Sequence, residues 1–303
     1  MESKKYTFIN EKYWMASPDW LNRSFSMLKS FSDVEKKSLL EFYSGDDMGD
    51  DEEMANGLPF TVLPNGIAII RITGTMQKHL DFFSFIFGGT STVDVRSQLD
   101  IALNTDAVKG VLLIIASGGG SVSGTNELAN DVRDFSAVKP INAFIEDLGA
   151  SAAFWTASQA GFISANETAE VGSIGTVAVI HDFSQMFEKE GIKVHVISTG
   201  EHKGAFVEGS EVTVDQLAEL QRNVDALNEV FQVAVSEGRE MPRSELAKVS
   251  DGRVFIAKEA VELGLIDAVE TLEDAVMRLS TAVNNRSHSN SERARALIKL
   301  RKQ

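Results

Sequence analysis

A serine with small neighbours lies in the stretch GASAAFW (149–155), where Ser151 follows a glycine and an alanine. Small neighbours allow a helix to pack closely, and they also allow other groups to approach the hydroxyl. A serine attacks a carbonyl only when a base takes its proton and donors stabilise the oxyanion that forms. The chemistry of Ser151 therefore depends on whether the rest of the sequence supplies a base and an oxyanion hole.

A glycine-rich stretch, SGGGSVSG (117–124), follows the apolar run VLLIIA (111–116) and supplies one candidate for that hole. Consecutive glycines expose backbone N–H groups. The N–H of Gly119 or Gly120 is one possible oxyanion donor, and the N–H of Ala152, directly after Ser151, is the second.

The same stretch also fits a different function. Gly118, Gly120 and Gly124 have the loose spacing of a dinucleotide-binding loop, and Glu146 ends the next predicted strand, where an acid could bind a ribose. The spacing is degenerate, so both interpretations stay open at this stage.

The base is either a histidine or a lysine. Among five histidines, His181 with Asp182 forms a triad candidate, whereas His195 alternates with apolar residues as in an ordinary strand. Lys203, in STGEHKGAF (198–206), follows a predicted strand end. A lysine has an ordinary pKa of about 10.4, so it must be desolvated to act as a base near neutral pH. On spacing alone, Lys203 is more simply a solvated loop residue.

The elements that must position these residues alternate between strands and helices. Such alternation predicts an α/β fold with largely parallel pairing. Strands are predicted at 66–76, 111–116, 141–146, 176–182 and 193–198. Helices are predicted at 127–135, 149–161, 183–191 and 212–239, and 97–108 is mostly helical.

Composition divides the chain into three zones. Residues 1–57 form an N-terminal extension with a helix at 32–43 and an acidic, solvated linker at 45–54. Residues 58–276 form the main domain, and the basic stretch 277–303 is expected to be a flexible or marginally helical tail.

Composition also excludes several functions. The 303 residues include no cysteine, which excludes disulfides, thiolate zinc sites and cysteine nucleophiles. The net charge of −15 argues against non-specific nucleic-acid binding. The most apolar run is too short to span a bilayer and the first residues lack a signal-peptide core, so a cytoplasmic location is expected.

Five segments, in this order, resemble one known family. They are GIAIIRITGTM, VLLIIASGGGSV, GASAAFWTASQAGFISANETAEVGSIG, STGEHKGA and DGRVFIAKEAVELGLIDAVETLEDAV. The chain from about 58 to 276 thus resembles the signal-peptide-peptidase-A family of serine peptidases, and most closely its phage prohead (capsid maturation) protease branch. The resemblance implies an α/β, Clp/crotonase-like fold of repeated β-β-α units with a mostly parallel sheet and a helical C-terminal part.

The resemblance also assigns roles to residues. Ser151 matches the nucleophile, Lys203 the general base, and Ser173 of the GSIG turn the serine that orients the lysine. Gly119 or Gly120, with Ala152, match the oxyanion donors, and the family requires no cofactor or metal. Gly118 replaces the family's usual proline, and the membrane anchor of many members is absent, which favours the phage-like branch.

The expected partners follow from the same resemblance. Substrate should be a protein or peptide lying as an added strand along the loop after residue 116, with pockets lined by Phe154 and Trp155. In relatives the lysine can reach the serine from a neighbouring subunit, so a ring-like homo-oligomer is expected. Capsid or scaffold proteins, in the prohead or the host cytoplasm, are the expected substrates, and the alternative is bacterial degradation of signal peptides and other peptides.

Three other functions remain open at this stage: a nucleotide-binding oxidoreductase, a crotonase-like acyl-CoA enzyme, and an inactive assembly or scaffold protein.

Overall fold

The computed structural model describes residues 14–16, 57–80, 84 and 88–300, and their side chains over 57–80, 84 and 88–286. The predicted helix at 32–43 and the acidic linker at 45–54 lie outside the described residues. The strands are β1 (Trp14–Ala16), β2 (Thr61–Val62), β3 (Ile67–Gln77), β4 (Gly89–Ser91), β5 (Gly110–Ser121), β6 (Ile141–Ala150), β7 (Phe162–Ala165), β8 (Glu170–Gly172), β9 (Val254–Ile256) and β10 (Ala268–Val269). The helices are α4 (Thr92–Asn104), α5 (Thr125–Val138), α6 (Ala152–Ala157), α7 (Ser184–Lys189), α8 (Val214–Gly238), α9 (Arg243–Leu246), α10 (Ala257–Glu262) and α11 (Leu272–Leu300).

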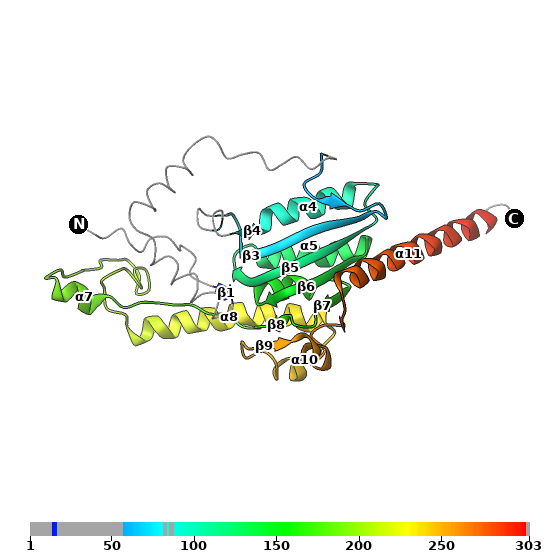
Figure 1. Cartoon of the computed structure of the whole chain (residues 1–303). Coiled ribbons are helices and arrows are strands. Elements are labelled where there is room, and N and C mark those ends of the chain that lie inside the picture. Colours follow the sequence, from blue (N-terminus) through cyan, green and yellow to red (C-terminus); the bar gives the residue numbers. More distant parts are fainter. Residues whose placement is uncertain (1–13, 17–56, 81–83, 85–87, 301–303) are drawn as a thin grey trace.

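A mostly parallel sheet forms the centre of the molecule (Figure 1), in the order β10-β7-β6-β5-β3-β2. All neighbours in this row are parallel except β2, which pairs antiparallel with β3 at the edge. Parallel neighbours need crossover connections, and α5 provides the one between β5 and β6. The predicted α/β class with a mostly parallel sheet is confirmed.

Strand β5 is buried on both faces, which explains why its sequence is continuously apolar rather than alternating. Val111, Leu113 and Ile115 belong to the larger core, together with side chains of α4, α5 and α6. Leu112 and Ile114 point to the other face and pack in a second cluster with side chains of α11.

Helix α11 extends the packed body beyond the boundary predicted at residue 276. Leu279 and Val283 are buried in the second cluster, against β5 and its neighbours. The predicted boundary therefore lies inside a helix whose first turns cover the sheet. Figure 1 shows the rest of α11 projecting away from the sheet.

Residues 176–213, which we call the arm, leave the body between β8 and α8 (Figure 1). The helix predicted at 183–191 is confirmed as α7, and the one at 212–239 as α8. The strands predicted at 176–182 and 193–198 are wrong, because only an isolated bridge at Val177 forms there. A strand needs a neighbour for its backbone hydrogen bonds, and within the described residues the arm forms such pairing only at the bridge of Val177.

Candidate active site

Ser151 is the single residue between β6, which ends at Ala150, and α6, which begins at Ala152. The helix predicted over 149–161 is therefore shorter and starts after the serine. The backbone of Ser151 has φ 57° and ψ −120°, a conformation that side-chain-bearing residues rarely adopt. Its N–H donates to the carbonyl of Gly172 at 2.7 Å, which helps to hold this conformation. A strained serine on a sharp strand-to-helix turn is typical of a nucleophile.

The hydroxyl of Ser151 is buried and unpaired. The residue is 1% exposed, and its Oγ finds no hydrogen-bond partner among the described residues. Most buried polar atoms have a partner, and an exception in a native site often marks chemistry. Among the described residues, the hydroxyl of Ser151 therefore makes no hydrogen bond that would stabilise the fold.

Ser173 lies next to Ser151 on the adjacent strand end. Strand β8 pairs parallel with β6, with Gly172 opposite Ala150, so the next residues along the two strands are Ser173 and Ser151. Ser173 also has a positive φ, 50°, and is 4% exposed, while its N–H donates to the carbonyl of Arg253 at 2.8 Å. Two of the predicted site residues are therefore brought together by neighbouring parallel strands.

The glycine-rich stretch is not the loop that the sequence suggested, because β5 continues as a strand through Ser121. Strand β6 pairs with β5 only as far as Ser117, which lies opposite Gly149. Two residues further along each strand are Gly119 and Ser151, so the glycines reach the level of the serine. The N–H of Gly119, at φ 97°, donates to Ser117 Oγ at 3.2 Å.

The two remaining predicted oxyanion donors, Gly120 and Ala152, also lie near Ser151. Gly120 pairs with Met76 of β3, and Ala152 is the first residue of α6, so its N–H has no acceptor within the helix. The structure thus places all three candidate oxyanion donors at the strand ends that carry Ser151.

Gly120 tolerates no side chain. A Cβ at this position would lie 1.8 Å from the carbonyl oxygen of Met76. We expect Gly120→Ala to cost more than about 3 kcal/mol of unfolding free energy, because backbone atoms on both sides must shift. Gly161→Ala is the matched control, because its Cβ would meet only an oxygen at 3.5 Å, and it should change stability by less than about 0.5 kcal/mol. Urea unfolding of both variants measures the difference, and equal stabilities would contradict the close contact.

Lys203 is not brought to Ser151 within one chain. It lies exposed in the arm, in a turn where its N–H donates to the carbonyl of Gly200 at 3.1 Å. Ser151 is buried without a partner. The dyad expected from the resemblance is therefore not assembled in a single copy.

The histidine alternative finds no support in the geometry. His181 and Asp182 are exposed in the arm. The Asp182 carboxylate accepts the N–H groups of Ser184 at 2.8 Å and Val212 at 3.2 Å. The hydrogen bond from the Ser184 side chain contributes most to lowering the pKa of Asp182. The backbone N–H groups of Ser184 and Val212 lower it further. Asp182 therefore binds the first residue of α7 and a residue at the end of the arm, rather than orienting a catalytic imidazole.

The prediction that Phe154 and Trp155 line substrate pockets is wrong. Their side chains are 0% and 1% exposed and belong to the main core. The Trp155 ring stacks on Phe231 of α8, with ring centroids 5.0 Å apart. These rings anchor α6 to the body and so fix the turn that carries Ser151.

The dinucleotide interpretation is also not supported. A phosphate-binding glycine loop turns directly into a helix whose first N–H groups face the phosphate. Here Gly118 and Gly120 lie inside β5, and Glu146 forms an ion pair with Arg71 at 3.4 Å. Strand neighbours, rather than a phosphate-sized cradle, surround Gly118 and Gly120, and of the three glycines only Gly124 lies at the start of a helix, α5.

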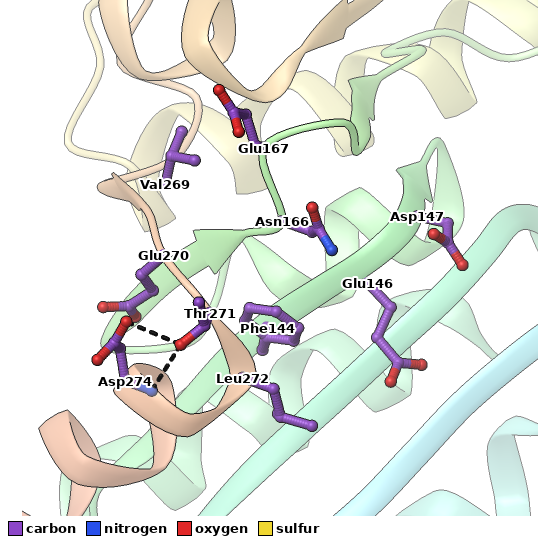
Figure 2. A pocket seen from close by; sticks show the side chains of 10 residues that line it. All are labelled: Phe144, Glu146, Asp147, Asn166, Glu167, Val269, Glu270, Thr271, Leu272 and Asp274. Carbon is purple, nitrogen blue, oxygen red and sulfur yellow. Dashed lines mark hydrogen bonds between the residues drawn. The ribbon is translucent and has the colours of Figure 1, made fainter.

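A pocket of about 660 Å³ lies elsewhere, beside β6, β7 and the start of α11 (Figure 2). Its acidic residues are Glu146, Asp147, Glu167, Glu270 and Asp274. Several of them have structural roles: Asp274 and Thr271 cap α11 through mutual hydrogen bonds, and Glu270 binds Arg278 at 2.8 Å. None of the residues predicted for the peptidase site lines this pocket, whereas Glu146, the candidate ribose-binding acid, does. Within the part of the chain that the structure describes, no group of three or more His, Asp or Glu side chains could hold a metal ion.

The fold and this geometry define an α/β protein with a serine in the position and conformation of a nucleophile. The sequence profile of peptidase family S49 matches residues 133–286. The chain belongs to peptidase family S49, a family of serine-type peptidases that includes the signal-peptide-peptidase-A proteins, and the resemblance stated from the motifs is confirmed.

Three relatives illustrate this membership. A Methanocaldococcus jannaschii protein assigned as a protease is 32% identical over 186 residues, which cover 61% of this chain and 60% of the relative. Capsid assembly protease C of Escherichia phage lambda is 27% identical over 238 residues, 78% of this chain and 54% of the relative. Protease 4 of Haemophilus influenzae is 25% identical over 272 residues, 88% of this chain and 42% of the relative. The matched regions thus span about half the length of these relatives.

Among the described residues, no helix has both the length and the apolar character needed to cross a membrane.

Proposed function

We propose that the protein is a serine endopeptidase that uses Ser151 as nucleophile and Lys203 as general base. The observation that carries this proposal is Ser151 itself: buried, unpaired and strained at the end of a parallel strand, level with the glycines of β5. A structural serine would gain nothing from this conformation, which costs about 1–3 kcal/mol.

The reaction follows from the groups around Ser151. Neutral Lys203 takes the hydroxyl proton onto its Nζ while Oγ attacks the peptide carbonyl, and Ser173 orients the amine. The oxyanion accepts hydrogen bonds from the N–H of Ala152 and from that of Gly119 or Gly120. Lys203 then protonates the leaving amine, and water hydrolyses the acyl-enzyme by the reverse sequence of proton transfers. The bond from Gly119 to Ser117 Oγ is long enough to be exchanged for the oxyanion.

We infer that the lysine comes from a second copy of the chain, and the exposure of Lys203 in the arm of one copy supports this. Contact with a second copy would also cover apolar surface. Nine of the fifteen exposed large apolar side chains of the described residues lie in the arm or at the start of α8, and a concentration of this kind marks an interaction surface. They are Val177, Val179, Met186, Ile192, Val196, Ile197, Val207, Val214 and Leu217. Burial between copies would also desolvate the amine, which favours its neutral form.

A charge in the arm should therefore prevent assembly. Ile197 is 96% exposed, so Ile197→Asp should leave the fold of one copy intact, shift the mass towards that of a single chain, and lower activity at least about tenfold. Val138→Asp is the control, because Val138 is 59% exposed on α5, outside the arm. Sedimentation velocity and peptide hydrolysis are measured on both variants. An Ile197→Asp protein with wild-type mass and activity would refute assembly through the arm.

For substrates, we propose capsid or scaffold proteins cut during phage head maturation, in the prohead or the host cytoplasm. This rests on the similarity to the lambda capsid assembly protease over 78% of this chain. General peptide degradation in a bacterium is the alternative, because protease 4 of Haemophilus influenzae matches 88% of the chain. Digestion of a purified coat and scaffold mixture, compared with free signal peptides, separates the two.

A serine-reactive phosphonate tests the chemistry directly. A peptidase should form a stoichiometric adduct that mass mapping places on Ser151. An oxidoreductase or an inactive scaffold protein would not react there, and a crotonase-like enzyme would not depend on Lys203. Absence of an adduct on Ser151 in the full-length assembly would overturn the proposal.

A further inference from the structure

A strand from the N-terminal extension pairs with the glycine-rich part of β5. Strand β1 runs antiparallel to it, with Trp14 opposite Ser121, Met15 opposite Gly120 and Ala16 opposite Gly119. These partners include both glycines whose N–H groups are candidate oxyanion donors.

The pairing partners of β5 show which of its edges β1 occupies. A strand has two edges, and β3 occupies one of them along β5 as far as Gly120, opposite Met76. Strand β1 must therefore lie on the other edge, where β6 pairs as far as Ser117 and then ends. Because β6 leads through Gly149 into Ser151, β1 continues the sheet at the place next to the serine.

This is the place where an extended substrate would be added to the sheet. Strand addition uses main-chain hydrogen bonds and is tolerant of sequence, so the chain's own backbone can fill it as well as a substrate can. Consistent with a closed site, Ser151 is 1% exposed. A tethered segment competes at a high effective concentration, because its binding is intramolecular.

We propose that residues 14–16 occupy the substrate groove of their own chain. They hold the site closed until a substrate displaces them. The inference rests on the proposed peptidase function, because it assigns the edge of β5 to substrate. It gives the N-terminal extension a regulatory role: the extension lowers the fraction of molecules that are competent to bind peptide.

A pair of introduced cysteines tests the position of β1 without relying on activity. The chain contains no cysteine, so Trp14→Cys with Ser121→Cys gives a single defined thiol pair in the full-length protein. Directly opposite residues point to the same face of a sheet, so mild oxidation should link this pair. Met15→Cys with Ser121→Cys is the control, because neighbouring residues of a strand point to opposite faces. Equal or absent cross-linking of the two pairs would overturn the pairing.

The oxidised pair then tests the competition. The cross-linked protein should hydrolyse a ten-residue peptide at least tenfold more slowly than the same protein after reduction, because the occupant can no longer leave. A cross-linked protein as active as its reduced form would overturn the inference. If wild type neither reacts with the phosphonate nor cuts peptide, the proposed function has failed, and the cross-linking ratio still reports on β1.

Proline variants give the converse result. Alternate residues of an antiparallel strand donate their N–H to the partner strand, so one of the two neighbours Trp14 and Met15 donates to β5. Either Trp14→Pro or Met15→Pro therefore removes an inter-strand hydrogen bond. The proline variant that removes it should raise kcat/KM for the peptide about threefold to tenfold over the alanine variant of the same position, which keeps the N–H donor. Two proline variants with the kcat/KM of their alanine controls would count against an occupant.

Discussion

Ser151→Ala and Ser151→Gly will both lose peptidase activity, by about 10⁴-fold or more, but the glycine variant will be the more stable of the two. Both remove the hydroxyl of the proposed nucleophile. Only glycine relieves the backbone, because Ser151 has φ 57° and alanine keeps a Cβ in that conformation. We expect the free energy of unfolding of Ser151→Gly to exceed that of Ser151→Ala by about 1–2 kcal/mol. Peptide hydrolysis and urea unfolding measure the two effects separately.

Ser158 supplies the control for the stability difference. It is a buried serine at the other end of α6, with an ordinary helical φ of −62°. Both Ser158→Ala and Ser158→Gly lose the hydroxyl and its hydrogen bonds with the carbonyl of Trp155 and the side chain of Gln159, so the loss of the hydroxyl cancels in their difference. There glycine should be the less stable, by about 0.5–1 kcal/mol. The same order at both positions would show that Ser151 is not strained, and an active Ser151→Ala would remove it from the mechanism.

Lys203→Ala will abolish activity on its own, and mixing it with Ser151→Ala will restore part of it. If the lysine of one copy serves the serine of the next, a mixed assembly contains some sites with an intact serine and an intact neighbouring lysine. Random assembly of equal amounts gives both groups to about one site in four, so co-refolded variants should recover up to about 25% of wild-type activity. The measurement is peptide hydrolysis by the co-refolded mixture, with each variant refolded alone as the baseline.

Lys193→Ala is the matched control for the lysine. Lys193 is also exposed in the arm, but no role is proposed for it, so its loss should change activity by less than about twofold. A mixture that stays inactive, although both variants assemble, would place the lysine on its own serine. Full activity of Lys203→Ala would remove it as the base.

The elements of the body could be predicted from sequence because local signals and packing agree there. The run VLLIIA reads as a strand buried on both faces, and β5 is buried on both faces. The helix at 212–239 has strong helical periodicity, and α8 spans most of that range. In the arm the same kind of signal fails. Residues 193–198 have the composition of a strand, but they pair with no strand among the residues that the structure describes. Strand formation depends on a partner as well as on propensity.

The sequence by itself determined the family, the α/β class and the candidate residues, because these follow from residue type and order. Only the tertiary structure decided their arrangement. The positive φ of Ser151 is accompanied by the hydrogen bond from its N–H to Gly172 and by the packing of Trp155 on Phe231, which anchors α6. The pairing of β1 with the glycines and the exposure of Lys203 depend on which edges and surfaces the folded chain leaves open. Such contacts join segments that are about 20 to more than 100 residues apart in the sequence, so local patterns carry no record of them.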